Sequence, residues 1–339
     1  MGIKNQPGNG LKMSLTKKSG VPVSQIISIK AFLLYILLLK YGLVNPFSDY
    51  FPFLPFIPAL DAIPRAIYSS LSVVLGVSIV TPLITKNYYQ SMSLISGLIV
   101  LFFLMSSKLL FSNSLTFVAC MLILSGLYFG TDYIFRIQIA LLYFGAAINK
   151  FLTADWWNGL YMDHLLREVF QVSHYQHNFP ADMIEVAIIL GILVILIEFA
   201  LGILVLVPKY TRMLIVFGLI FHGSMLVITS GRLSLHFMYI MSAAYVSISS
   251  LELTPVKLIG GNSVSKCILS RLDFSDTLFI RNEATDYFVI EKHGKIYQGK
   301  KAYLELVLTK QCALLTYFFL LLFTMVFPRL VGKISVYFS

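Results

Sequence analysis

The chain has 339 residues, of which 58% are hydrophobic and only 12% are charged. Soluble domains carry about twice that charged fraction, so the composition excludes ordinary soluble enzymes, disordered proteins and DNA-binding domains. In such an apolar chain, the net charge of +10 indicates basic loops beside anionic lipid rather than a nucleic-acid surface. We therefore expect a polytopic, all-α protein of the cell membrane that contacts membrane lipid and no nucleic acid.

The cysteines give no framework for disulfides or metal. There are three, Cys120, Cys267 and Cys312, and two of them lie in apolar runs. Neither the odd number nor the wide spacing fits a disulfide scaffold or a zinc site. We expect free thiols, no metal and no bound cofactor.

Residues 1–25 are polar and contain four lysines, with no apolar stretch before a cleavage motif. This pattern predicts a basic cytoplasmic tail rather than a cleaved signal peptide. The tail lysines also favour an orientation with the N-terminus inside, by the positive-inside rule.

Nine apolar segments follow, each close to the length of about 20 residues that crosses a bilayer. The third and fifth are short, which leaves a partly re-entrant course open for either. The first eight form a predicted bundle over residues 26–251, and residues 310–339 hold the final helix and its tail. The nine predicted spans are 26–44, 66–84, 90–106, 113–130, 134–149, 182–207, 212–229, 234–251 and 311–330.

Two segments break the pattern of spans. Residues 51–58, F-P-F-L-P-F-I-P, contain three prolines that forbid a regular helix, so they predict an interfacial loop. Residues 252–309 are rich in charge of both signs and predict a small soluble α/β domain. After eight spans this domain returns to the cytoplasmic side. Its expected strands are 256–259, 287–290 and 295–297, with a turn at 293–294 and a helix at 263–272.

Glu198 and His222 are ionisable residues inside predicted spans, where such groups are costly and become candidates for function. Each lies about 15 Å from the loop around Lys209 at the usual helical rise. The two helices are antiparallel neighbours, so we expect the two side chains to contact each other near the membrane centre. The pair is either a polar contact that holds the two helices together or a proton-handling site.

The other histidines give weaker signals. His236 begins the eighth span and is expected at the membrane rim. His174 and His177 are spaced to share a helix face, but two histidines do not complete a metal site.

The fifth span ends in a lysine followed by two tryptophans. Lys150 has two interpretations on composition alone. It snorkels to the surface beside an aromatic belt of Trp156 and Trp157, or it is a functional group among small residues. The full segment is L-Y-F-G-A-A-I-N-K-F-L-T-A-D-W-W-N-G, residues 142–159.

This segment, continued as L-Y-M-D-H-L-L, resembles the hallmark of the horizontally transferred transmembrane domain, the family of the vitamin K-dependent gamma-carboxylase. Residues 197–212, 221–227 and 235–243 resemble later elements of that family. The resemblance implies Lys150, Glu198 and His222 as candidate catalytic residues. It also implies candidate substrate-binding residues, which are Asp155, Trp156, Gly159, Arg212 and His236.

Two departures affect the expected chemistry. Mammalian carboxylases carry two adjacent lysines before this Asp-Trp, and the second is the base; here Lys150 occupies the first position and Phe151 the second. Their lumenal domain has no counterpart, so vitamin K-driven carboxylation is not expected.

The segment 256–307 resembles a degenerate thioredoxin-like domain in which Cys267 stands alone, which predicts a structural remnant.

Among compact members of the family, the chain is most similar to the sporulation-delaying protein B group. This implies a membrane protein that helps mature a secreted antimicrobial peptide, with a peptide precursor and a soluble companion protein as partners. The alternative is a membrane enzyme that acts on a lipid quinone or a peptide and uses Lys150 or His222 as a base. A structural or transport role is a third hypothesis.

Overall fold

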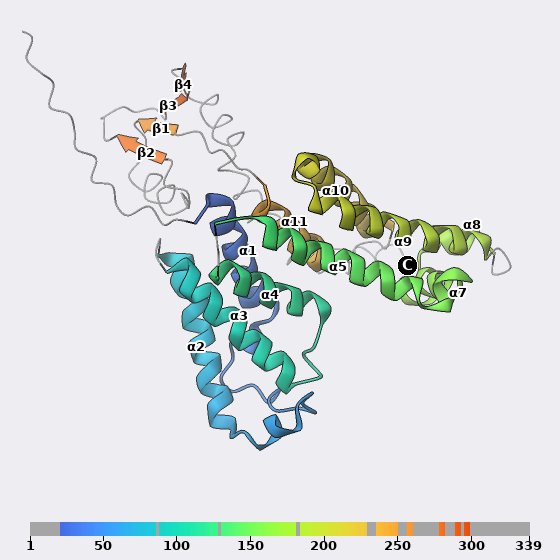
Figure 1. Ribbon diagram of the computed structural model, residues 1–339, viewed down its shortest axis with the longest axis horizontal. Helices are drawn as coiled ribbons and strands as arrows, with labels where there is room; N and C mark the ends of the chain where they lie inside the picture. The colour runs from blue at the N-terminus through green and yellow to red at the C-terminus, as the bar shows by residue number, and fades with distance from the viewer. Residues whose placement is uncertain are drawn as a thin grey trace, which may run out of the picture.

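The computed structural model describes residues 21–85, 88–127, 130–180, 184–228 and 235–249, together with four short strands. The described helical part is a bundle of eight longer helices and an arm of short ones (Figure 1). The longer helices are α1 (Val23–Leu39), α2 (Arg65–Ile84), α3 (Tyr89–Ser106), α4 (Asn113–Gly126), α5 (Tyr133–Phe151), α9 (Glu185–Leu206), α10 (Thr211–Ile228) and α11 (Leu235–Ser247).

Four of the described helices, α2, α3, α5 and α9, are long and apolar enough to cross a membrane, and α1 and α4 are shorter apolar helices. The chain is thus a mainly helical protein with membrane-spanning character. Each of the first eight predicted segments contains one helix, and the ninth, 311–330, lies outside the described residues. The possible re-entrant breaks are absent from α3 and α5, which run unbroken over 18 and 19 residues.

α1 is the central helix of the bundle. It packs against α2, α3, α4 and α11, and Phe32, Leu33 and Ile36 are completely buried. A mostly apolar helix is expected in the middle of a bundle, and α1 also buries the polar side chains of Gln25, Ser28 and Lys30.

Small residues bring α2, α3 and α4 into close contact. The hydroxyls of Ser78 and Ser96 are 2.7 Å apart between α2 and α3. On α3, a Cβ at Gly97 would lie 2.8 Å from the carbonyl oxygen of Ala119 on α4. Small and hydroxyl-bearing residues of this kind are the usual contacts between helices in a membrane.

The predicted loop at 51–58 contains no α-helix. Phe51 turns into the bundle and stacks on Tyr68 and Phe103, with ring centroids 5.6 and 4.3 Å away. One aromatic side chain therefore fastens the proline-rich loop to α2 and α3.

The four strands form one sheet in the order β2-β1-β3-β4. They are β1 (Val256–Ile259), β2 (Leu278–Arg281), β3 (Val289–Lys292) and β4 (Lys295–Gln298). β1 pairs parallel with β2, and β3 and β4 form a hairpin around residues 293–294. The sequence predicted β1 and β4 well, placed β3 two residues early and missed β2. The expected helix at 263–272 lies outside the described residues.

Candidate functional site: a buried lysine–glutamate pair on α5

Three polar side chains follow one another along α5 at intervals of seven residues: Arg136, Tyr143 and Lys150. Seven residues make about two turns of an α-helix, so the three lie on one face. This face points toward α9, α10 and α11, because each side chain bonds to a residue on one of these helices. We call these three residues the polar stripe of α5.

At the far end of the stripe, Lys150 forms an ion pair with Glu198 of α9. The ammonium nitrogen is 2.7 and 2.8 Å from the two carboxylate oxygens, and the lysine and glutamate side chains are only 17% and 11% exposed. A charged pair with so little access to water is costly to bury, which marks it as the strongest candidate for a functional site.

The direction of the Lys150 side chain distinguishes its two interpretations. A snorkelling lysine at a helix end extends past that end toward water. Lys150 instead turns back along α5, and its ammonium lies 3.4 Å from the carbonyl oxygen of Ala146. The charge is therefore held inside the bundle, where its main partner is Glu198.

Trp156 forms the apolar wall of the site. It belongs to α6 (Ala154–Trp157), is 8% exposed, and its ring centroid lies 5.2 Å from the Lys150 ammonium, a distance suited to a cation–π contact. Gly191 of α9 allows the approach, because a Cβ there would lie 2.7 Å from the carbonyl oxygen of Trp156.

Gly159 positions the chain after Trp156 rather than lining the site. It precedes α7 (Leu160–His164) with φ of +80°, a conformation that favours glycine. A Cβ at this position would also meet the backbone nitrogen of Ile188 at 2.9 Å. Its role in the structure is a close backbone contact with α9.

The predicted contact between Glu198 and His222 is wrong. The Nε2 atom of His222 lies 2.9 Å from the Tyr143 hydroxyl, and Glu198 pairs with Lys150. Counting helical rise correctly placed both residues deep in their helices, but it carries no information on which face each side chain occupies. Glu198 and His222 both face α5, and their partners are two residues of α5, Lys150 and Tyr143.

His222 is part of a second buried cluster. Tyr143 also hydrogen-bonds the hydroxyl of Tyr245 on α11. Gly218 of α10 leaves space for the Tyr245 side chain, because a Cβ at that position would meet the Tyr245 ring. The His222 ring lies edge-on to Phe237. Three helices thus share a hydrogen-bonded group of one imidazole and two phenols.

Three predicted binding residues make no polar contact with the ion pair. Asp155, Arg212 and His236 are exposed. His174 and His177 lie on the exposed surface of α8 (Ser173–Asn178), and the described part of the chain holds no group of three metal-ligating side chains.

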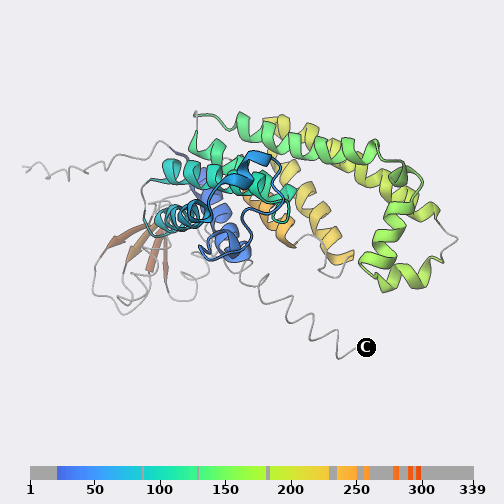
Figure 2. The same cartoon turned by 90° about the horizontal axis from the view of Figure 1, so that it is seen from below.

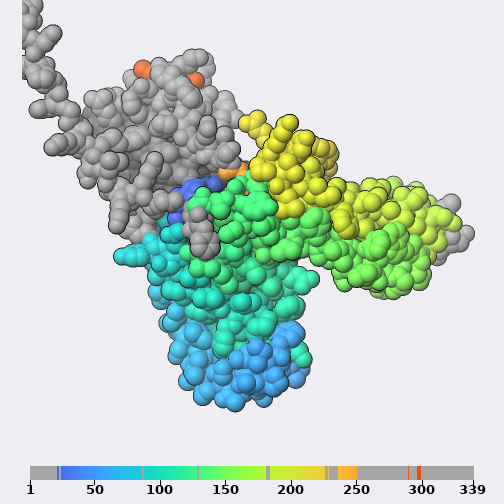
Figure 3. Space-filling view, viewed as in Figure 1, coloured from blue at the N-terminus to red at the C-terminus, as the bar shows by residue number. Residues whose placement is uncertain are grey.

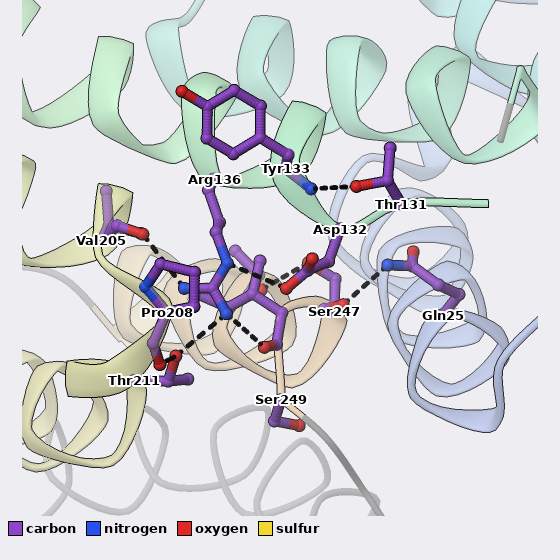
Figure 4. Close-up of polar contacts among 12 residues, drawn as sticks. Gln25, Thr131, Asp132, Tyr133, Arg136, Val205, Pro208, Thr211, Ser247 and Ser249 are labelled. Atoms are coloured by element: carbon purple, nitrogen blue, oxygen red, sulfur yellow. Dashed lines mark hydrogen bonds and ion pairs between the residues drawn. The ribbon is translucent and has the colours of Figure 1, made fainter. Parts of the chain in front are cut away.

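Arg136 is the main feature that the sequence analysis missed. Its side chain is 4% exposed and pairs with Asp132 at 2.8 Å. It also donates to the carbonyl oxygens of Val205 and Ile248 and to the hydroxyl of Thr211, at 3.1, 3.0 and 2.9 Å (Figure 4). These acceptors lie at ends of α9, α10 and α11, where carbonyl oxygens lack helical partners. A signal was present, because Arg136 falls just inside a predicted span with an acidic residue one turn before it.

Two residues of α1 add to this picture. The Gln25 amide donates to the carbonyl oxygen of Ser247 at 2.6 Å, beside the Arg136 network (Figure 4). Lys30, in the first half of α1, is 3% exposed, and its ammonium lies 5.3 Å from the Tyr89 ring centroid. Lys30 was not predicted as a candidate, although a lysine within an apolar run was the available signal.

Comparison with known proteins found no matching family model, no similar curated protein and no similar solved structure.

Proposed function

We propose that this protein is a multipass membrane protein that acts in the maturation of a secreted antimicrobial peptide, with the Lys150–Glu198 pair at its working site. The proposal combines the resemblance of residues 142–159 to the horizontally transferred transmembrane domain with the geometry of that segment. The single observation that carries it is the Lys150 ammonium, which is turned into the bundle and held between Glu198 and Trp156.

This geometry suits the recognition of a peptide segment. An ammonium has three N–H donors, and here they are directed to one carboxylate and one distant carbonyl oxygen. A carbonyl or carboxylate group of a substrate is able to take one of these donors while Glu198 keeps the lysine charge neutralised. The Trp156 face offers an apolar contact beside the charge.

The topology proposed with this function has the N-terminus inside and eight or nine spans. In that arrangement α5 leads outward, so the segment after Lys150 lies on the outer side, where a secreted peptide leaves the membrane. The strand domain then lies in the cytoplasm. An impermeant thiol reagent that labelled Cys267 in intact cells, with Cys120 and Cys312 removed, would invert this orientation.

We also propose that the strand domain is a thioredoxin-like remnant. Its parallel β1–β2 pair and its β3–β4 hairpin support this. A parallel pair needs a crossover of about a dozen residues or more, which the stretch 260–277 is long enough to supply. Because Cys267 is the only cysteine of that domain, Cys267→Ser is expected to leave function intact.

A second candidate is an enzyme acting on a lipid quinone. The observation in its favour is the cluster of His222, Tyr143 and Tyr245, since a chain of hydrogen bonds between an imidazole and two phenols is able to move a proton. The neighbouring genes separate the two candidates. A small secreted precursor with a soluble companion favours peptide maturation, and a quinone operon favours the enzyme.

The experiment measures mature peptide in the medium of cells that express the precursor, the companion and variants of this chain. Lys150→Arg and Lys150→Ala are each expected to abolish the peptide at normal membrane abundance, because a planar guanidinium does not replace a compact ammonium in a shaped site. Lys209→Arg is the matched control on an exposed lysine. Wild-type peptide yield with Lys150→Arg would reject the site.

A further inference from the structure

The segment between α5 and α9, residues 152–180, folds into an arm. It contains α6, α7, a π-helical turn (Leu165–Val169) and α8. In Figure 2 the yellow-green helices of the arm run crosswise to the long pair α5 and α9, and Figure 3 shows the arm as a separate lobe at the far end of that pair.

The arm lies alongside the first turns of α9. Gly159 touches Ile184 and Ile188, and Trp156 touches Gly191. The 22 residues of α9 extend about 33 Å at the helical rise, close to the hydrocarbon thickness of about 30 Å. Its first turns, and therefore the arm packed on them, fall at the boundary between hydrocarbon and headgroups.

The inner face of the arm is packed and its charges are paired. Trp156, Met162, Leu166 and Tyr175 form a buried cluster against α9. Arg167 bonds Asp163 at 2.8 Å and also donates to the carbonyl oxygens of Phe179 and Pro180. The arm is thus held in shape by its own contacts.

Tyr175 fastens α8 to this network. Its hydroxyl donates to Asp163 at 2.8 Å. Burial, together with this hydrogen bond, raises the pKa of Tyr175 to about 12, so the phenol keeps the proton that it donates at physiological pH.

The outer face changes in polarity along the arm. Its beginning exposes a run of large apolar side chains, and α8 exposes polar ones. The only charged residue in the apolar part is Asp155, which suits the edge of a membrane better than its hydrocarbon interior. The apolar residues are Phe151, Leu152, Trp157, Leu160 and Tyr161, with exposures from 40% to 77%; the polar ones are His174, Gln176, His177 and Asn178.

We propose that this apolar outer face, Phe151 to Tyr161, is a lipid-docking surface seated at the boundary between acyl chains and headgroups, with α8 in water. Its occupant is the bilayer because the face continues directly from α5 and toward α9, two helices long and apolar enough to span the membrane. Tryptophan and tyrosine are enriched at this depth, and amphipathic helices lie in the same plane. The proposal stands whether or not the protein matures a peptide.

The two tryptophans of the chain allow a direct test. They are adjacent but differ in exposure: Trp156 is 8% exposed and Trp157 is 40% exposed. Trp156→Phe and Trp157→Phe each leave one reporter. Each full-length variant is reconstituted into phosphatidylcholine vesicles that carry bromine, a fluorescence quencher, near the top or near the end of the acyl chains.

Trp157 is expected to lose about half of its emission with bromine near the top of the chains, because that quencher lies at the interfacial depth where tryptophan is enriched, and less with bromine at the chain ends. Trp156 is expected to change little in either vesicle. Leu160→Glu in the Trp156→Phe background should weaken the lipid quenching and increase quenching by aqueous iodide. Gel filtration and thermal unfolding establish that this variant remains folded.

Quenching of Trp157 by iodide but by neither lipid would overturn the proposal, since the face would then lie in water. Stronger quenching by bromine at the chain ends would place the arm inside the hydrocarbon, also against the proposal. Protection from both bromine and iodide would mean that protein covers the face. No peptide is needed, so failure here is distinct from failure of the proposed function.

Discussion

Arg136 and Lys150 are two buried cations on the same face of the same helix, and they are held in different ways. Arg136 has five N–H donors, and bonds run from all three of its nitrogens to Asp132, Val205, Thr211 and Ile248. Lys150 meets one carboxylate, one carbonyl oxygen at 3.4 Å and an aromatic ring. The arginine side chain is 4% exposed and the lysine side chain 17%.

The two sets of contacts differ in how many hydrogen-bond donors they occupy. A planar guanidinium that bonds the ends of several helices leaves little capacity for a ligand, so Arg136 fixes how α5, α9, α10 and α11 meet. A single ammonium with one strong partner retains the capacity to exchange that partner. We therefore expect the near end of the polar stripe to determine stability, and we propose that the far end carries the activity.

The largest expected effect is loss of folding when Arg136 is changed. Arg136→Met leaves the carbonyl oxygens of Val205 and Ile248 without a donor, and each unsatisfied buried group costs about 1–3 kcal/mol. It also removes the ion pair with Asp132, whose side chain is 47% exposed. Thermal unfolding in detergent should show a much lower midpoint and a reduced yield of monodisperse protein. Arg136→Lys should not restore the stability, because one ammonium does not replace the planar guanidinium with its several N–H donors. A wild-type unfolding midpoint for Arg136→Lys would show that Arg136, like Lys150, needs only a positive charge for stability, and would contradict the proposed difference between them.

At the far end of the stripe, Lys150→Met should destabilise the protein by about 1–3 kcal/mol, since Glu198 loses its partner. The double variant Lys150→Met with Glu198→Leu should recover most of that loss, because an apolar pair can replace a buried ion pair. Thermal unfolding of the single and double variants measures this recovery. Additive losses would show that the two side chains are not coupled.

The middle of the stripe should respond less. Tyr143→Phe and His222→Gln are each expected to cost about 1 kcal/mol, the usual value for a hydrogen bond between membrane helices. The double variant should cost less free energy than the sum of the two single variants, since both single variants remove the same hydrogen bond between Tyr143 and His222. Glu198→Gln combined with His222→Gln serves as the control pair and should be closer to additive.

The smallest effects are expected at Asp155, Arg212 and His236. These side chains are exposed, and none of them is among the polar contacts of Lys150 and Glu198. Asp155→Asn, Arg212→Gln and His236→Gln should change the unfolding free energy by about 0.5 kcal/mol or less and leave peptide yield near wild type. Loss of yield at any of them, with normal abundance, would extend the site beyond the Lys150–Glu198 pair.

The helices were predictable because a run of apolar residues sufficient to cross a bilayer is a local property of the sequence. The depth of Glu198 and His222 followed from counting residues, whereas their partners depended on which way each helix is rotated. Arg136 escaped notice because a cation near a span end is usually a loop residue, and only tertiary packing brings three other helix ends to it. β2 was missed although it is as long as β1 and β4, which were predicted, so strand length does not account for the omission.

The resemblance of residues 142–159 to a known family drew attention to Lys150, and the structure adds the reason to select it over its neighbours. Of the eight candidate residues, Lys150, Glu198 and Trp156 come together. His222 lies in a separate cluster, and Gly159 supports the backbone. Composition and spacing do not distinguish these roles, because they depend on the direction of individual side chains.

The most direct test of the central claim is the yield of mature peptide per unit of folded membrane protein for the double variant Lys150→Met with Glu198→Leu. This variant keeps the helix contacts but has no charge at the far end of the stripe. We predict an unfolding midpoint near that of the wild type and no mature peptide in the medium. Peptide at the wild-type level from this variant would show that the buried pair is only a contact between helices.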